Sequence, residues 1–165
     1  MDLDSVYDQM LQRIKEQKGD RARLGVEVLM WVSRAERPLR IDELCHALAV
    51  EMETTDPDQE NICPRNTVLG SCLGLAIVDQ ETLTVRLIHY TLQEYLYRPG
   101  MLPGAHRTLA QSCLAYLNYD RVKGLPVNKV PDLGRNTLPR TFFSIGEATR
   151  KWSSRITRNH LRLNY

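Results

Sequence analysis

The chain of 165 residues, 42% of them hydrophobic, is long enough to bury one modest core. Its formal net charge of +2 hides an asymmetry: residues 121–165 hold ten Lys/Arg against two Asp/Glu, a net charge of +8, whereas residues 1–120 carry −6. Because no apolar run approaches roughly 18 residues, the sequence excludes a membrane-spanning helix and a signal peptide, and it favours a cytoplasmic protein.

Hydrophobic periodicity predicts three helices at the start of the chain, over residues 2–17, 21–35 and 41–49. Each range repeats apolar residues at i, i+3, i+4 and i+7, the spacing of one buried helix face. Gly19 breaks the first helix, and Asp20 is expected to cap the second. Trp31 is expected to flank the buried face of that second helix.

Residues 51–63 are polar and acidic and predict a solvated loop. Their spacing lacks the central Gly and the closing Glu of a calcium loop, so no metal site is expected there. Pro64 is expected to open a helix of about ten residues, with Leu69 and Leu73 facing inward and Gly74 ending it.

A hairpin is predicted next, with strands over residues 75–78 and 83–88 and a turn over residues 79–82. From residue 92 the pattern becomes helical up to about residue 98, and Thr91 and Glu94 form a T-x-x-E sequence typical of a capping box. His89 lies at this junction between strand and helix. A last helix over about residues 105–118 is expected to direct these apolar residues inward: Leu109, Ala110, Cys113, Leu114 and Leu117.

This order of elements predicts a mainly α fold, namely a winged helix with a helical core, a two-stranded β-hairpin as its wing and flanking helices. The domain is expected to span residues 20–120. Residues 1–19 are expected to form a helix that belongs to a preceding region, and residues 121–165 a basic, disordered tail.

The motifs of common enzymes are missing from the sequence. It contains no G-x-x-x-x-G-K-[ST] phosphate loop, no G-x-S-x-G elbow, no H-E-x-x-H and no G-x-G-x-x-G. The four cysteines show no C-x-x-C spacing, and Cys45, Cys72 and Cys113 fall on apolar helix faces, which favours buried thiols over metal ligands or disulfides. We therefore expect no catalytic residue, no metal and no cofactor bound by this chain alone.

Nucleic-acid binding is the first alternative that a winged helix raises. The recognition helix would lie at about residues 65–73, where Arg65 is the only cation and Asn66, Thr67 and Ser71 are the other polar groups. The wing tip carries Asp79 and Glu81. Because groove binding needs several Lys/Arg to neutralise phosphates, and residues 1–120 are net negative, the sequence argues against DNA as a partner.

Several segments resemble one family. Leu3-Asp4-Ser5-Val6-Tyr7 followed by Arg13-Ile14, the stretch from Pro38 to Glu51, the stretch from Val85 to Leu96, and the helix from Ala105 to Leu117 resemble, in this order, the winged helix of fungal NACHT-type STAND NTPases. Such NTPases often carry ankyrin or WD40 repeats. The same module is named after the winged helix of GPI inositol-deacylase-like proteins, although the hydrolase elbow is missing here.

The resemblance implies regulation by contact between proteins. In STAND proteins this winged helix packs on the nucleotide-binding domain and helps to hold the inactive, ADP-bound state, so the implied partner is a NACHT NTPase domain in cis or in trans. His89 occupies the position that reaches the ADP phosphate in a full-length context. An equally weighted alternative is that His89 only caps and packs the junction, since Tyr90 replaces the acidic residue that often follows it.

Two further departures from the family pattern bear on what the chain is. Arg40 stands where relatives usually have a Ser or Thr cap, which is expected to leave Glu43 without its capping-box partner. After about Thr137 the family pattern stops, and a shifted reading frame could restore it. The sequence therefore predicts an orphan or truncated fragment, with a frameshifted end as a hypothesis and a non-functional gene fragment as a second alternative.

Overall fold

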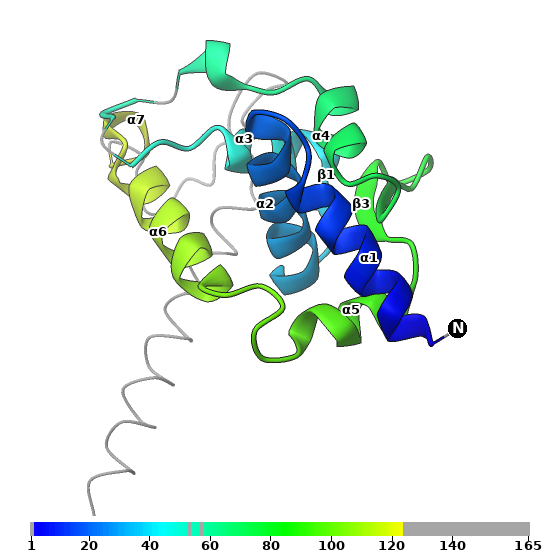
Figure 1. Ribbon diagram of the computed structural model, residues 1–165. Coiled ribbons are helices and arrows are strands. Elements are labelled where there is room, and N and C mark those ends of the chain that lie inside the picture. Colours follow the sequence, from blue (N-terminus) through cyan, green and yellow to red (C-terminus); the bar gives the residue numbers. More distant parts are fainter. Residues whose placement is uncertain (1, 53, 57, 124–165) are drawn as a thin grey trace, which may run out of the picture.

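The computed structural model describes residues 2–52, 54–56 and 58–123, and its elements follow the predicted order (Figure 1). The helices are α1 (Leu3–Lys15), α2 (Asp20–Arg34), α3 (Ile41–Leu48), the 3₁₀ turn η1 (Gln59–Asn61), α4 (Arg65–Ser71), α5 (Tyr90–Tyr97), α6 (Ala105–Asn118) and α7 (Asp120–Lys123). The strands are β1 (Leu39–Arg40), β2 (Ala76–Val78) and β3 (Thr84–Leu87). The predicted mainly α winged helix is confirmed. Residues 121–123, where the disordered basic tail was predicted to begin, instead belong to α7, and residues 124–165 of that tail lie outside the described residues.

Helix α2 is the centre of the molecule. It contacts α1, α3, α4, α5 and α6, and Val28 and Leu29 on it are completely buried. Trp31 is also buried, with 4% of its surface exposed, so the prediction that it flanks the buried face is wrong. A helix surrounded on several sides buries a wider face than the single stripe that amphipathic spacing indicates.

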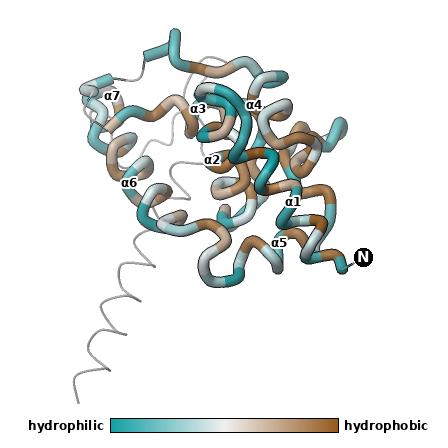
Figure 2. Tube along the Cα trace, viewed as in Figure 1, coloured by the Kyte–Doolittle hydropathy of each residue, from teal (hydrophilic) through white to brown (hydrophobic). Residues whose placement is uncertain are grey.

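Helix α1 contributes to the same core. Its two faces differ in hydropathy (Figure 2), and Tyr7, Leu11 and Ile14 on the apolar face are buried against the rest of the core. The predicted division into a helix within residues 1–19 and a domain over residues 20–120 stays a prediction, but the packing of α1 is continuous with that of α2.

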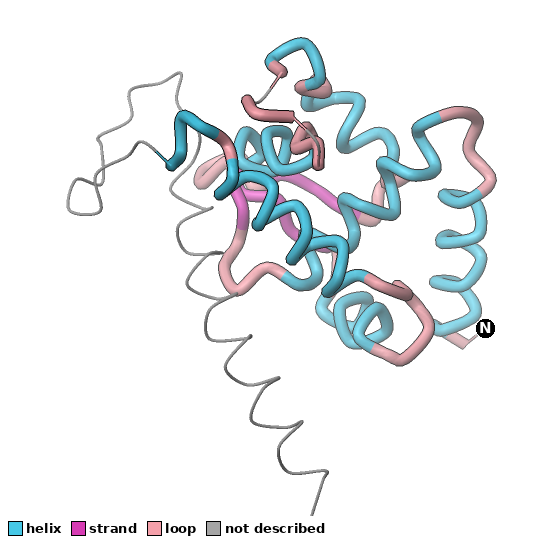
Figure 3. The backbone as a smooth tube through the Cα atoms, turned by 90° about the vertical axis from the view of Figure 1, so that its left-hand side faces the viewer, coloured by secondary structure: helices cyan, strands magenta, loops and turns pink. Residues whose placement is uncertain are grey.

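The sheet is small and antiparallel, with the strand order β1-β3-β2 (Figure 3). The predicted hairpin pairs β2 with β3, and Ile77 lies opposite Arg86. Its turn is built on Asp79, whose Oδ1 accepts hydrogen bonds from the backbone N–H groups of Glu81 and Thr82, both at 3.0 Å. Strand β1, which is two residues long and pairs Leu39 with Val85, was not predicted from the sequence.

Two helix ends differ from the prediction. Helix α2 begins at Asp20 itself, after Gly19 with a φ of 63°, so Asp20 lies in the first turn and its side chain does not cap the helix. Helix α4 ends at Ser71, and Leu73 has a φ of 48° and an exposed side chain. Leu73 was predicted to face inward, but the left-handed conformation of Leu73 and Gly74 turns the chain toward β2 before the apolar stripe can continue.

The buried face of α6 is rotated from the predicted one. Cys113 is buried as expected, whereas Leu114 is 63% exposed and Leu117 is 37% exposed, so both were wrongly placed in the core. Tyr116 and Tyr119 are buried instead, with their rings edge-to-face at 6.0 Å. A tyrosine buries a large apolar ring when its hydroxyl finds a partner, and the Tyr119 hydroxyl accepts from the Glu51 backbone N–H at 3.2 Å.

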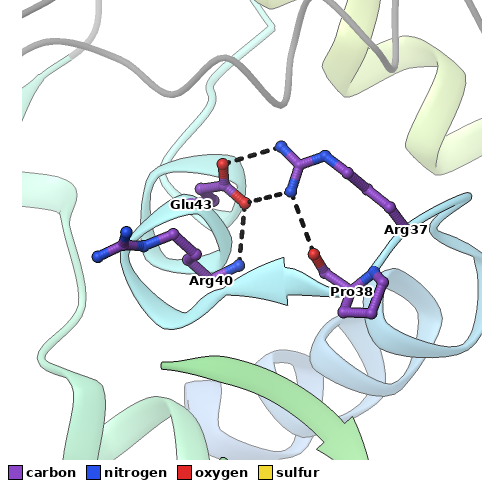
Figure 4. Close-up of polar contacts among 4 residues, drawn as sticks. All are labelled: Arg37, Pro38, Arg40 and Glu43. Carbon is purple, nitrogen blue, oxygen red and sulfur yellow. Dashed lines mark hydrogen bonds and ion pairs between the residues drawn. The ribbon is translucent and has the colours of Figure 1, made fainter. Parts of the chain in front are cut away.

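The start of α3 is held by Glu43 (Figure 4). Its carboxylate accepts the backbone N–H of Arg40 at 2.9 Å and two hydrogen bonds from the Arg37 guanidinium, at 2.9 and 3.0 Å. Arg40 has no side-chain acceptor and so cannot complete a capping box, as expected. Glu43 nevertheless has a charged partner, because the Arg37 guanidinium binds its carboxylate through two hydrogen bonds.

Candidate functional site

His89 lies where β3 leads into α5. It has an extended backbone (φ −150°, ψ 147°) and is the N-cap of α5, with its Nδ1 accepting the backbone N–H of Thr91 at 3.3 Å. The helix begins at Tyr90, so Thr91 is its second residue and the predicted capping box of Thr91 and Glu94 is wrong. His89 therefore caps α5, which is one half of the alternative role expected for it from the sequence.

The hydroxyl of Thr91 extends this contact into the interior. Thr91 Oγ1 lies 2.7 Å from His89 Nδ1 and 2.8 Å from the hydroxyl of Tyr7 on α1. Tyr7 is buried, and 84 positions separate it from Thr91. No local sequence pattern connects two residues so far apart, and Tyr7 reads simply as one member of the apolar stripe of α1. Tyr7 was therefore not among the site residues predicted from the sequence.

The hydrogen-bond directions follow from the acceptor at Nδ1. Because a backbone N–H points at Nδ1, this nitrogen holds a lone pair, and the neutral imidazole carries its proton on Nε2. The Thr91 hydroxyl then donates to Nδ1 and accepts from the Tyr7 hydroxyl. Among the described residues, Nε2 has no hydrogen-bond partner, so the exposed ring presents one N–H donor.

The surroundings of His89 combine aromatic surface with a helix N-terminus. Tyr90 is 69% exposed, and its ring centroid lies 4.7 Å from that of His89. The first turn of α5 contains no acidic side chain. The N-terminus of a helix carries partial positive charge and free N–H groups. Together with the Nε2–H donor, this surface favours an anionic group over a cation.

Two other described histidines lie on other helices, His46 on α3 and His106 on α6. Burial lowers the pKa of His46 on α3, and Asp42 acts in the opposite direction. Burial and the nearby charge of Arg34 both lower the pKa of His106 on α6. Within the ranges that the structure describes, no group of three or more His, Cys, Asp or Glu is arranged to hold a metal ion.

The cysteines behave as buried thiols, which confirms the prediction for Cys45, Cys72 and Cys113. Burial is the main cause that raises the pKa of Cys45 to about 11, and it raises the pKa of Cys72 and Cys113 to about 12. Since the thiolate is the reactive form of cysteine, these three side chains are unreactive near neutral pH.

The predicted recognition helix offers few groups for a nucleic acid. Arg65 forms an ion pair with Asp42 at 2.5 Å, and Ser71 is buried with its hydroxyl donating to the Val68 carbonyl at 2.7 Å. At the wing tip, hydrogen bonds from Thr82 and Glu81 lower the pKa of Asp79, which keeps that carboxylate charged. The cation of the helix is therefore already paired, and the carboxylate at the wing tip repels phosphates.

Membrane crossing also finds no support in the described helices. None of the helices in that part of the chain combines the length and the apolar character that a bilayer-spanning segment requires.

Comparison with known proteins agrees with this architecture. A family model described as "GPI inositol-deacylase, winged helix domain" matches residues 7–117. Among curated proteins, "Azaphilone pigments biosynthesis cluster protein L" of Monascus ruber is 30% identical over 70% of this chain. The chain spans only 28% of the length of that relative. No solved structure matches significantly.

Proposed function

Because this chain belongs to the family of the GPI inositol-deacylase winged helix domain, we propose that it is a non-catalytic regulatory module that acts by binding another protein domain. The partner is the nucleotide-binding domain of a NACHT-type STAND NTPase, in cis or in trans, in the fungal cytoplasm. Such NTPases often carry ankyrin repeats. The module stabilises the inactive, ADP-bound state of that domain.

The geometry of His89 is the single observation that carries this proposal. Capping uses only one nitrogen of the imidazole, so the other nitrogen of an exposed ring is left for a ligand. Here Nδ1 is bound by Thr91, and the exposed ring keeps Nε2–H as a donor without a partner among the described residues. We therefore assign to His89 a hydrogen bond to a phosphate oxygen of ADP held by the partner domain.

The helix N-terminus supports the same assignment. A phosphate near the start of α5 would meet the positive end of the helix, and no carboxylate in the first turn would repel it. Tyr90 replaces the acidic residue that often follows this histidine in relatives. At this position Tyr90 adds no negative charge and presents an exposed aromatic face to the partner.

The test is a binding measurement with the full 165-residue chain. The partner is the NACHT nucleotide-binding domain of a fungal STAND NTPase from which its own winged helix has been removed. Calorimetry with this domain loaded with ADP, or with a non-hydrolysable ATP analogue, gives the two affinities. We expect the ADP form to bind at least about tenfold more tightly, which corresponds to 1.4 kcal/mol of coupling. His89→Ala is expected to remove most of this preference.

His106→Ala serves as the matched control, because it removes another exposed histidine that lies on α6. This variant is expected to keep the preference for ADP. Equal affinity for the two nucleotide states, or the same loss in both alanine variants, would contradict the proposed role of His89.

A further inference from the structure

Polar contacts fasten the first half of helix α1 to α5 and to Arg98, which directly follows α5, and the two helices are in contact (Figure 1). The Arg98 guanidinium binds Asp4 at 2.6 Å, the Tyr95 hydroxyl donates to Asp8, and the Tyr7 hydroxyl meets Thr91 at 2.8 Å. Burial and the Asp8 hydrogen bond raise the pKa of Tyr95 to about 12, so Tyr95 stays a donor.

Only one of these three contacts continues to His89. The Tyr95 and Arg98 contacts end on carboxylates of α1, whereas the contact of Tyr7 leads through Thr91 Oγ1 to Nδ1 of His89. The phenol, the hydroxyl and the imidazole form a chain with a defined direction. A hydroxyl has a single proton, so when Tyr7 donates to Thr91, the Thr91 proton is directed toward His89.

We infer that Tyr7 is a positioning residue for His89: by donating to Thr91, it holds the imidazole as the tautomer with its proton on Nε2. The docking of α1 on α5 thus determines that His89 presents an N–H donor at Nε2. When α1 leaves α5, Thr91 loses the Tyr7 hydroxyl as a donor, and its own proton is no longer directed toward His89. The Nδ1–H tautomer, which gives up the 3.3 Å contact with the Thr91 backbone N–H and donates to Thr91 Oγ1, then becomes more populated. The ring then presents an acceptor at Nε2, which repels a phosphate oxygen.

This coupling gives α1 a regulatory meaning that rests on the proposed function. A movement of α1 would change the affinity of the junction for ADP although α1 reaches His89 only through Thr91. The tautomer of His89 is nevertheless a property of this chain alone. Its measurement stands whether or not a NACHT domain is the partner.

The experiment is nuclear magnetic resonance of the ¹⁵N-labelled imidazoles in the full chain at about pH 8, where a histidine of ordinary pKa is neutral. The His89 signals are assigned by their loss in His89→Gln. In the unaltered chain the proton is expected on Nε2. In Tyr7→Phe the ratio of Nε2–H to Nδ1–H is expected to fall about two- to tenfold, the equivalent of one neutral hydrogen bond.

Tyr95→Phe is the matched control, since it also removes one phenol hydroxyl from the interface of α1 and α5 but does not touch Thr91. It is expected to leave the tautomer ratio of His89 unchanged. On α5, Thr91→Val is expected to reproduce the effect of Tyr7→Phe, and Thr91→Ser, which retains the hydroxyl, to preserve the original ratio.

The remaining outcomes overturn the inference. An Nδ1–H tautomer in the unaltered chain would reverse the direction of the hydrogen bonds. An unchanged ratio in Tyr7→Phe would show that Tyr7 only packs. Equal changes in Tyr7→Phe and Tyr95→Phe would show a general displacement of α1. In the calorimetric assay above, Tyr7→Phe is expected to weaken the preference for ADP, but less than His89→Ala does. If Tyr7→Phe changes the tautomer ratio but not the preference for ADP, only the proposed NACHT partner is rejected.

Discussion

At the scale of single residues, the neighbours of His89 decide what each of its two ring nitrogens can bind. The sequence places His89 at a strand-to-helix junction. In the structure, its Nδ1 accepts the Thr91 backbone N–H at the start of α5. That use of one nitrogen fixes what the other can do. The capping and phosphate-binding interpretations, which the sequence presents as alternatives, are therefore compatible with each other in one ring.

The two histidines with lowered pKa values predict a weak sensitivity to acid. Since folding lowers the pKa of His46 and His106 below the ordinary 6.5, the unfolded chain binds protons more readily. The stability that depends on the neutral rings is present above about pH 6.5 and is lost as the pH falls through the unfolded value toward the folded values. The double variant His46→Gln, His106→Gln should lose less thermal stability than the unaltered chain between about pH 7 and pH 5.

Thermal unfolding at a series of pH values, followed by circular dichroism, measures this difference. The window stops near pH 5 because carboxylates such as Asp79, whose pKa is lowered in the folded chain, add their own loss at lower pH. If both chains lost the same stability across the window, other groups would have to account for the acid sensitivity.

At the scale of elements, the close approach of α2 and α4 depends on Gly25. A Cβ built at this position would lie 2.4 Å from the Ser71 carbonyl oxygen and 2.8 Å from Ile14 Cγ2. Helix propensity alone predicts that Gly25→Ala stabilises α2 by about 1 kcal/mol. We expect the opposite, a net loss of about 1–3 kcal/mol in the free energy of unfolding, because overpacking displaces α4 and α1.

Gly70→Ala is the control for this prediction. Gly70 also lies within a helix, α4, and a Cβ there would meet no atom of the surrounding structure within 4 Å. This variant is expected to be stabilised by up to about 1 kcal/mol. Urea unfolding of the two variants gives both values, and a Gly25→Ala chain as stable as the original would show that the helices can separate without cost.

At the scale of the whole molecule, α1 decides where the folding unit begins. Tyr7, Leu11 and Ile14 are buried in the core around α2, and each buried side chain of this size contributes roughly 1.5–3 kcal/mol. Their combined contribution approaches the typical total stability of a domain, about 5–15 kcal/mol. A chain of residues 20–165 is therefore expected to lose its cooperative thermal transition.

Circular dichroism against temperature tests this expectation, with Leu3→Ala as the control. Leu3 lies on the exposed side of α1, so its replacement should leave the midpoint almost unchanged. If residues 20–165 unfolded at the same temperature as the full chain, α1 would belong to a preceding region, as the division at residue 19 predicts.

The sequence by itself determined the type and order of the elements other than β1, η1 and α7, together with the hairpin and the position of His89. These features depend on periodicity, turn residues and helix breakers, which act over a few neighbouring residues. The local signals misplaced boundaries where backbone conformation decided, as at Gly19 and Leu73 with their positive φ. They also mistook the buried face of α6, because hydropathy undervalues a tyrosine whose hydroxyl has a partner.

Only the tertiary structure decided what surrounds each position. The chain from Tyr7 through Thr91 to His89, the contact of Gly25 with Ser71, and the pairing of β1 with β3 join residues that are far apart in the sequence. Each depends on how helices and strands pack, and packing is set by the shape of the whole core. For that reason the sequence could place the candidate site at the junction, whereas its donor direction and its link to α1 required the fold.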